Sequence, residues 1–330
     1  MSKIRIGCYI GSWPQNIGNA FFDFGARAIL NEAFPEAQFF NIGGAVHWMF
    51  NESALKHKES LLGNFCYRAL KKMKILPPFG NNNNSFEIGE AAEVDVLVFA
   101  GMSMCREFVE NNGRTFLAAA KRGVAVLGLG AGGLFYNNDE VRSFSEFFNK
   151  LPRASIITRD DDTFEMFSGN IKQIVKGIDC AFCLPEYFTP PRLALPSYDI
   201  ENFDDSSTVH PVIDHCGRMV IQTHHDLWGP LSKRYISKPN TMISDVPEDY
   251  LSLYSQVNTT YSDRVHACVA SLAYGNRARL YNKTPRKSLF TKMGLENITC
   301  SEVSLNMELR EELKQAQVEN ARNLIENMLS

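Results

Sequence analysis

The chain has 330 residues, which is enough for two domains with sizeable cores. Its formal net charge of −3 creates no basic field that would attract nucleic acid or an anionic membrane, and no apolar run approaches the length of a transmembrane helix. The start of the sequence lacks a signal-peptide pattern, and the eight cysteines are scattered, several of them inside apolar segments. We therefore expect a cytoplasmic protein with reduced thiols.

The first half of the chain alternates short apolar runs with helical patterns. Continuous apolar runs that alternate with helices are typical of a parallel sheet covered on both faces. The expected strands are 3–10, 37–44, 94–101, 124–133, 154–160 and 171–179, and the expected helices are 17–34, 61–73, 105–123 and a short one after 160.

Residues 188–210 are rich in proline and show no periodicity, so we interpret them as an interdomain linker. After them the alternation of strands and helices resumes. The expected order is a strand at 217–225, a helix at 246–257, a strand at 258–263, a helix at 264–275, a strand at 277–282 and a short helix near 288–294. A helical repeat of apolar residues at 306–329 predicts a docked terminal helix, with Leu309, Leu313, Ala316, Leu324 and Met328 on one face.

This order predicts an α/β protein with two Rossmann-like domains that face a cleft. The N-terminal domain covers 1–187, and the C-terminal domain covers 211–330 and ends in the docked helix. In such sheets ligands bind outside the carboxyl ends of the strands, so the residues at those ends are the candidates for function.

The loop after the first strand is the first candidate. Asn16, Gly18 and Asn19 lead into a helix whose free N–H groups can hold an anion or hydroxyls. The alternative is an ordinary N-cap turn, because Asn and Gly are favoured there.

Two glycine-containing strand ends follow. Gly128, Gly130 and Gly133 spell a GxGxxG pattern, but it lies in mid-chain and no convincing helix follows it, so we favour close backbone approach over dinucleotide binding. Gly101 is a similar glycine at the end of an earlier strand.

Arg159 follows a strand and precedes a helix that Asp161, Asp162 or Thr163 can cap. At this place Arg159 suits the binding of a phosphate or carboxylate, and a salt bridge to a neighbouring aspartate is the alternative.

The stretch TTYSDRVHACVASLAYG reads as a strand end, a turn and an apolar helix that Arg264 begins and Asp263 can cap. An arginine in the first turn opposes the helix dipole, and an anion bound beside Arg264 and His266 would remove that conflict. The alternative is that Arg264 pairs with an acidic residue and His266 covers the core. Cys180 and Cys183 form a single CxxC, which is half of a usual structural zinc site, so we expect no metal.

The order of these motifs resembles the polysaccharide pyruvyl transferase family over roughly residues 7–296. The resemblance rests on Asn16-Ile17-Gly18-Asn19, DVLVFAGMSM, VAVLGLGAGG, ITRDDDTFEMF, GIDCAFCLP, TTYSDRVHACVASLAYGNRARLY and KSLFTKMGLE. Two positions depart from the family pattern. Asn19 stands where the family has aspartate, and Met102 stands where it has a second glycine.

The resemblance implies a fold similar to GT-B glycosyltransferases, without a cofactor. It implies transfer of pyruvate from phosphoenolpyruvate to two hydroxyls of a sugar, glycan or lipid-linked saccharide, as in the biosynthesis of an exopolysaccharide. Arg159, Arg264 and His266 would bind the donor, and His266 and Arg264 would act in catalysis. The remaining expected contacts are Asn16, Gly18, Asn19, Gly101, Gly130, Tyr281 and Lys287, with Lys283 as the alternative to Lys287.

Two other functions stay open at this point. One is a nucleotide-sugar-dependent glycosyltransferase of the same architecture, because fold does not determine chemistry. The other is a catalytically silent relative, which the changes at Asn19 and Met102 allow. The sequence also leaves open whether the chain forms a homo-oligomer.

Overall fold

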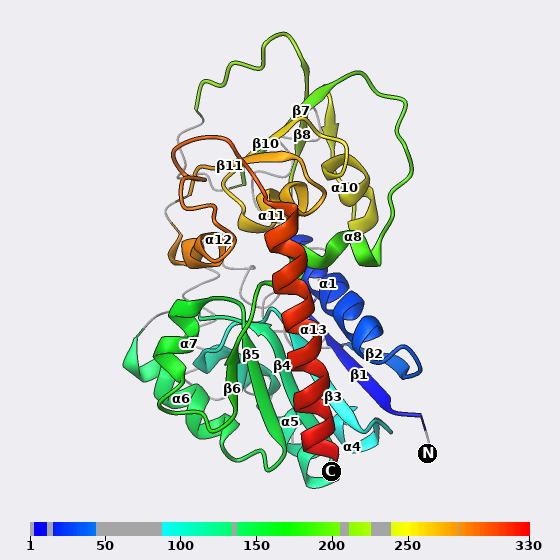
Figure 1. The fold of residues 1–330 in the computed structure, drawn as a ribbon, viewed down its shortest axis with the longest axis vertical. Helices are drawn as coiled ribbons and strands as arrows, with labels where there is room; N and C mark the ends of the chain where they lie inside the picture. The colour runs from blue at the N-terminus through cyan, green and yellow to red at the C-terminus, as the bar shows by residue number, and fades with distance from the viewer. Residues whose placement is uncertain are drawn as a thin grey trace, which may run out of the picture.

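The computed structural model describes residues 3–11, 16–43, 88–133, 137–204, 211–225, 239–282 and 284–330. Two α/β domains lie one above the other in Figure 1, with α1 and α13 running between them. The expected helix at 61–73 lies outside the described residues.

The first domain is built on a fully parallel sheet with the strand order β2-β1-β3-β4-β5-β6. All residues of β3 and β4 are buried, as the continuous apolar runs predicted. The strands are β1 (Arg5–Ile10), β2 (Gln38–Gly43), β3 (Val96–Ala100), β4 (Ala125–Ala131), β5 (Ala154–Thr158) and β6 (Ile174–Lys176).

Helices cover this sheet. They are α1 (Gly18–Ala33), α4 (Ile88–Ala91), α5 (Arg106–Lys121), α6 (Asn138–Phe148), α7 (Asp161–Phe167), the 3-10 turn η2 (Cys180–Cys183) and α8 (Leu184–Tyr187). Two local expectations were wrong. A helix, α6, does follow the glycine-rich strand end, because Asn137 caps it by accepting from the N–H of Glu140. The cap of α7 is Asp160, whose side chain accepts from the N–H of Thr163 at 2.7 Å.

The second domain contains a sheet with the order β12-β11-β10-β7-β8-β9, in which only the β11–β12 pair is antiparallel among the described strands. The strands are β7 (Tyr198–Asn202), β8 (Met219–Thr223), β9 (Thr241–Met242), β10 (Thr259–Ser262), β11 (Arg277–Leu280) and β12 (Val303–Ser304). The helices are α10 (Pro247–Tyr254), α11 (Val265–Ala273), the 3-10 turn η3 (Pro285–Lys287), α12 (Ser288–Thr291) and α13 (Met307–Leu329).

The structure corrects the linker at 188–210. β7 lies inside this stretch and pairs with both β8 and β10, so the linker interpretation is wrong for residues 198–202. The strand is short and follows a proline-rich run, which masked its pattern in the sequence.

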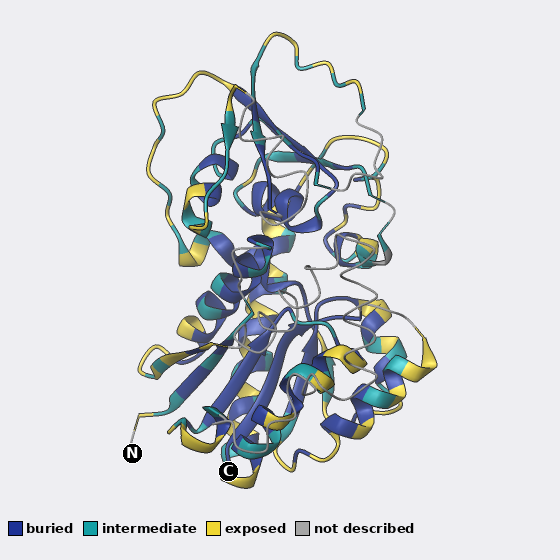
Figure 2. Cartoon of the chain, turned by 180° about the vertical axis from the view of Figure 1, so that it is seen from behind, coloured by how far each residue is buried: buried dark blue, intermediate teal, exposed yellow. Residues whose placement is uncertain are grey.

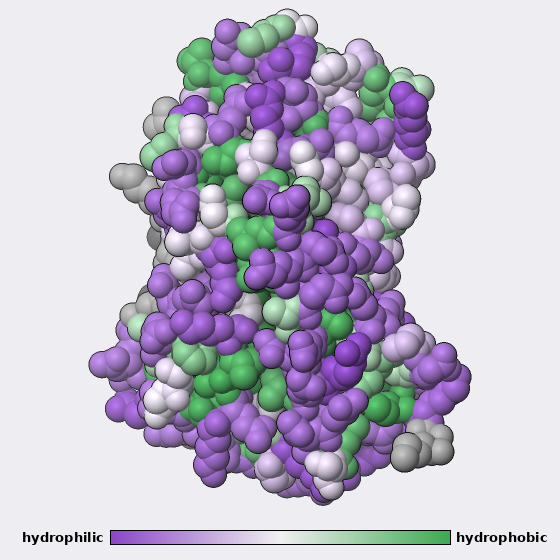
Figure 3. All heavy atoms as spheres, in the orientation of Figure 1, coloured by the Kyte–Doolittle hydropathy of each residue, from purple (hydrophilic) through white to green (hydrophobic). Residues whose placement is uncertain are grey.

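The terminal helix α13 returns to the first domain, where it packs on α1, β4 and β5 (Figure 1). Its buried face also differs from the apolar face expected from the sequence: Ala316 is exposed, whereas Arg310, Lys314 and Gln317 are buried with Val318, Ala321, Ile325 and Met328. Polar residues occupy this face because they meet polar partners in the first domain. On the outer side, hydrophilic side chains predominate along α13 (Figure 3).

One cluster of buried apolar side chains continues from the first sheet through α1 and η2 to α11 and the second sheet. Figure 2 shows the buried residues concentrated on the strands and at this waist. In the described part of the chain, no helix is both long and apolar enough to cross a bilayer.

Gly25 marks the closest approach of α1 to η2. A Cβ at this position would lie 1.7 Å from the carbonyl oxygen of Cys180. Alanine normally stabilises a helix interior relative to glycine, but here we expect Gly25→Ala to lower the free energy of unfolding by about 1–3 kcal/mol through overpacking. Urea denaturation measures this change.

The matched control is Gly169→Ala, at an exposed glycine whose Cβ would meet no atom within 4 Å. The control variant should change the free energy of unfolding by less than about 0.5 kcal/mol. Equal effects of the two substitutions would contradict the close packing of α1 on η2.

Candidate active site between the two domains

A cavity of about 230 Å³ lies where the carboxyl ends of the two sheets meet. Its lining comes from the loops after β1, β3 and β5 of the first domain, from the first halves of α1 and α5, and from α11 and η3 of the second domain. The lining residues are Gly11, Asn16, Asn19, Phe22, Gly101, Met102, Ser103, Cys105, Glu107, Phe108, Asn111, Asn112, Arg159, His266 and Arg286.

The glycines of the first domain bring α1 close to its neighbours. Gly101 has a φ of +57°, and a Cβ there would lie 2.2 Å from the ring of Phe22. Gly18 packs against the second domain, since its Cβ position is 3.2 Å from both the Nδ1 of His225 and the Cβ of His266. No described side chain caps α1, so the N-cap alternative for Asn16 and Asn19 is not what the structure shows.

Arg159 is only 1% exposed although it lines the cavity. Its Nη2 donates to the carbonyl of Gly133 at 2.8 Å, and its Nε lies 3.4 Å from the carboxylate of Asp160. A Cβ on Gly132 would lie 1.9 Å from Nε, so glycine at this position makes room for the guanidinium. Neither of these contacts uses Nη1, so the N–H groups of Nη1 can donate to a ligand.

His266 faces a buried carboxylate from the other domain. Its Nε2 lies 3.5 Å from the Oδ2 of Asp179, and neither atom has another hydrogen-bonding partner in the described part of the chain. Oδ1 of Asp179 accepts from the N–H of Ala181 at 2.9 Å, which anchors the carboxylate at the start of η2. The ring of His266 also meets the ring of Phe22 edge to face, at 5.5 Å between centroids.

Asp179 stays ionised in spite of its burial. Burial raises the pKa of this carboxyl group, but contact with His266 and the charges of His266 and Arg159 outweigh it and lower the pKa below the ordinary value. A carboxylate that faces Nε2 favours a proton on that nitrogen and fixes the orientation of the ring. Nδ1 then carries the free lone pair of the ring and can accept a proton.

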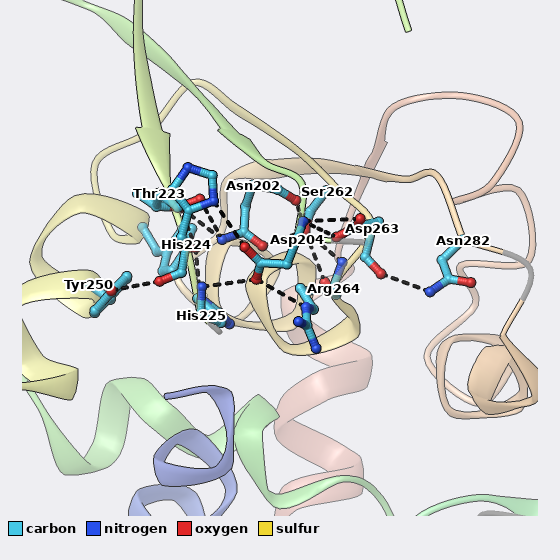
Figure 4. Close-up of polar contacts among 11 residues, drawn as sticks. Asn202, Asp204, Thr223, His224, His225, Tyr250, Ser262, Asp263, Arg264 and Asn282 are labelled. Carbon is cyan, nitrogen blue, oxygen red and sulfur yellow. Dashed lines mark hydrogen bonds and ion pairs between the residues drawn. The ribbon is translucent and has the colours of Figure 1, made fainter. Parts of the chain in front are cut away.

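Arg264 belongs to a second polar network, at the ends of β7, β8 and β10 (Figure 4). The buried carboxylate of Asp204 accepts from the Nε of Arg264 at 3.0 Å and from the N–H of His225 at 2.9 Å, and it lies 2.9 Å from the Nδ1 of His224. Burial raises the pKa of Asp204, but His224 and Arg264 outweigh that effect and lower it below its usual range.

The start of α11 differs from the expectation. Arg264 occupies the N-cap position, and the helix begins at Val265. Asp263 does not cap it: its carboxylate accepts from the N–H of Asp204 at 3.1 Å. The conflict between an arginine and the helix dipole is therefore smaller than expected, because the guanidinium has a carboxylate partner.

Comparison with known proteins assigns the family. The family model for polysaccharide pyruvyl transferase matches residues 16–276. The chain belongs to this family, and it is therefore a transferase.

Solved structures similar to this transferase share its fold. The MnaA–UDP co-structure from S. aureus has a TM-score of 0.53 at 10% identity and covers 99% of this chain and 90% of the other. A UDP-N-acetylglucosamine 2-epimerase from Listeria monocytogenes, described as putative in its name, has a TM-score of 0.51 at 10% identity, with coverage of 100% and 91%. At this low identity the likeness shows only the fold, which is two Rossmann-like domains of the GT-B type. No curated protein sequence matches the chain.

The structure of the transferase brings five of the expected site residues together around the cavity: Asn16, Asn19, Gly101, Arg159 and His266. The other expected residues do not line it. Arg264 bonds Asp204, Gly130 packs against Cys180, the ring of Tyr281 packs at a tilt against Phe203, and Lys287 is exposed. Gly18 lies behind the lining, and Lys283 is outside the described residues.

The sequence did not identify three residues of these polar networks and of the cavity. Asp179 lies in the motif GIDCAFCLP, and its position at the end of an apolar strand was the signal that could have identified it. Asp204 lay in the expected linker, and Arg286 stood between the two lysines considered, although it lines the cavity.

The cysteines of the CxxC are part of the core. Cys180 and Cys183 are fully buried, and burial raises the pKa of both thiols. In the described part of the chain, no group of three or more His, Cys, Asp and Glu side chains is arranged to hold a metal ion.

His225 provides a test of the interface through pH. Burial lowers the pKa of His225 to about 3; the charge of Asp204 opposes this effect in part, and the charge of Arg264 adds to it. Below pH ~6.5 His225 is protonated in the unfolded chain but stays neutral in the native state, so the free energy of unfolding falls as the pH drops toward 3. Replacing His225 with Gln, which can still bond Tyr254, should reduce the slope by about 1.4 kcal/mol per pH unit between pH 6 and 4. Urea denaturation across this range measures it, and parallel curves for the two proteins would contradict a buried neutral His225.

Proposed function

We propose that this transferase moves the pyruvyl group of phosphoenolpyruvate onto two hydroxyls of a sugar, glycan or lipid-linked saccharide as a cyclic ketal. The product would belong to a polysaccharide such as an exopolysaccharide or a cell-surface glycan. The observation that carries the proposal is the cavity lined by both the buried Arg159 and His266, whose imidazole faces the carboxylate of Asp179. Membership of the family supports the same reaction.

The donor matches the positive charge of the cavity. Phosphoenolpyruvate carries a phosphate and a carboxylate, and arginine binds both groups through its fork of N–H donors. Arg159 supplies this fork from the end of β5, and Arg286 lines the cavity from η3 on the opposite domain. We assign the donor to these two arginines and His266. A role of Arg264 in donor binding stays a prediction, because its Nε is engaged with Asp204.

His266 is suited to the proton transfers of the reaction. A proton delivered to the methylene carbon of the donor makes the neighbouring carbon an oxocarbenium-like centre, which one acceptor hydroxyl attacks. A second hydroxyl then forms the other C–O bond while the bond to phosphate breaks. The two hydroxyls lose two protons: one balances the proton gained by the methyl group, and the other leaves with phosphate or solvent. Imidazole is a common general acid and base in enzymes, and because Asp179 faces Nε2 of His266, Nδ1 is the nitrogen left for this role.

The acceptor has polar partners on the first domain. Asn16, Asn19 and Glu107 line the cavity over β1 and β3, where the strand order of the sheet changes direction. Amide and carboxylate groups bind sugar hydroxyls, and the ring of Phe22 offers an apolar face beside them. Asn19 thus lines the cavity although it replaces the aspartate of the family pattern.

Donor binding is tested by thermal unfolding. Phosphoenolpyruvate at millimolar concentration should raise the Tm of the wild-type protein, because a ligand that binds only the native state stabilises it. Arg159→Gln should lose the shift, and so should Arg286→Gln, which removes a less buried charge. The charge-matched control is Arg142→Gln on the exposed face of α6, which should keep it. No shift with phosphoenolpyruvate but a shift with UDP would favour the nucleotide-sugar alternative and overturn the proposal.

Catalysis by His266 is tested by phosphate release. With a panel of methyl hexopyranosides as acceptors, His266→Gln should lower kcat by about 10²–10⁴-fold, the usual contribution of a general acid or base. The KM for phosphoenolpyruvate should change much less, because Arg159 and Arg286 remain. A His266→Gln enzyme with normal turnover would show that another group moves the protons.

A further inference from the structure

Gln317 of α13 is fully buried, although it carries a polar amide on a helix. Both ends of this amide bond one residue of the first domain. Oε1 accepts from the N–H of Ile178 at 2.6 Å, and Nε2 donates to the carbonyl of Ile178 at 3.1 Å. The side chain thereby pairs with both backbone groups of Ile178, just after strand β6 has ended.

Ile178 immediately precedes Asp179. The carbonyl that Gln317 holds is part of the peptide that leads into Asp179, so the amide fixes the plane of that peptide. On the other side, the N–H of Ala181 holds Oδ1 of Asp179, which leaves Oδ2 directed at His266. Rotation of the 178–179 peptide would swing the carboxylate away from the imidazole.

The surrounding sequence leaves room for this amide. A Cβ on Gly177 would lie 2.3 Å from the Oε1 of Gln317. Nε2 of Gln317 also lies 3.6 Å from the Sγ of Cys180, and a Cβ on Gly130 would lie 2.7 Å from that same sulfur. Gly177, just after β6, and Gly130, near the end of β4, therefore permit the approach of one side chain from α13.

We propose that Gln317 is a positioning residue for the Asp179–His266 pair. Through Ile178 it holds the carboxylate at the distance and angle that orient the imidazole. The terminal helix α13 thus sets the geometry of the Asp179–His266 pair, in which Asp179 belongs to the first domain and His266 to the second. The consequence for turnover rests on the function proposed above, whereas the consequence for the His266 ring does not.

The test compares Gln317→Met with Gln315→Met. Methionine matches glutamine in length but offers no amide. Gln315 is an exposed glutamine on the same helix that bonds Glu32 and Glu311 and makes no contact with Ile178 among the described residues. The first readout needs no substrate: long-range ¹H–¹⁵N spectra of the histidine rings, with the His266 signals assigned by their loss in His266→Gln.

In the wild type we expect the tautomer with the proton on Nε2. In Gln317→Met the His266 signals should move toward those of a solvent-exposed histidine, and in Gln315→Met they should stay in place. Unchanged His266 signals in a folded Gln317→Met protein would overturn the proposal. This result stands whether or not phosphoenolpyruvate is the donor, so it separates failure of the positioning role from failure of the proposed function.

The second readout is the split between kcat and KM. A misplacement of about 1 Å by a mutation far from the chemistry can cost about 10²-fold in rate, so kcat of Gln317→Met should fall by up to that factor with little change in the KM for phosphoenolpyruvate. The groups that face Asp179 are His266 from α11, Arg159 from the end of β5 and Cys180 from η2. When His266 separates from Asp179, the carboxyl group loses a contact that lowers its pKa, so the pKa of Asp179 rises.

If Gln317→Met fails to fold, the second variant is Gln317→Asn. Asparagine keeps the amide but is one methylene shorter, so it cannot reach both the N–H and the carbonyl of Ile178. Its His266 signals should shift in the same direction as in Gln317→Met. Wild-type His266 signals in Gln317→Asn would overturn the proposal.

Discussion

The buried carboxylate of Asp179 opposite the imidazole of His266 is the contact on which the rest of the structure depends. An ionised carboxylate without water needs partners on several sides. It receives an N–H from η2, the imidazole from α11 and the charge of Arg159 from the end of β5. These groups come from both domains, so the pair can form only when the two sheets are held with their carboxyl ends together.

Close backbone packing creates that arrangement. α1 lies against η2 and α11, and α13 crosses from the second domain back to the first sheet. Glycines stand at the points where a side chain would prevent the approach: Gly18 beside the two histidines, Gly25 against Cys180, and Gly132 under Arg159. Gly130, the second glycine of the GxGxxG pattern, makes room for Cys180, and Gly132, at a variable position of the pattern, makes room for the guanidinium.

Most of the fold could be predicted from the sequence, because parallel strands buried on both faces leave long apolar runs such as 96–100 and 125–131. Strand β7 could not be predicted, because it is short and follows prolines. The packing of α13 on the first domain could not be predicted either, because its buried face carries Arg310, Lys314 and Gln317. Periodicity detects apolar faces only, and these three side chains are buried against polar partners.

The site was partly predictable for a similar reason. Strand-end position identified Arg159 and His266, because residues there face the cleft in any such sheet. The ion partner of Arg264 and the role of Asp179 depend on contacts between segments 60 and 87 residues apart, which one sequence does not reveal.

We expect His266, oriented by Asp179, to deliver a proton to a donor held by Arg159. A crystal structure of the protein with phosphoenolpyruvate tests this step. The donor should lie in the cavity, with its phosphate or carboxylate on the Arg159 guanidinium and its methylene carbon about 3–3.5 Å from the His266 imidazole. A donor bound outside this cavity, or with its methylene carbon directed away from His266, would contradict it.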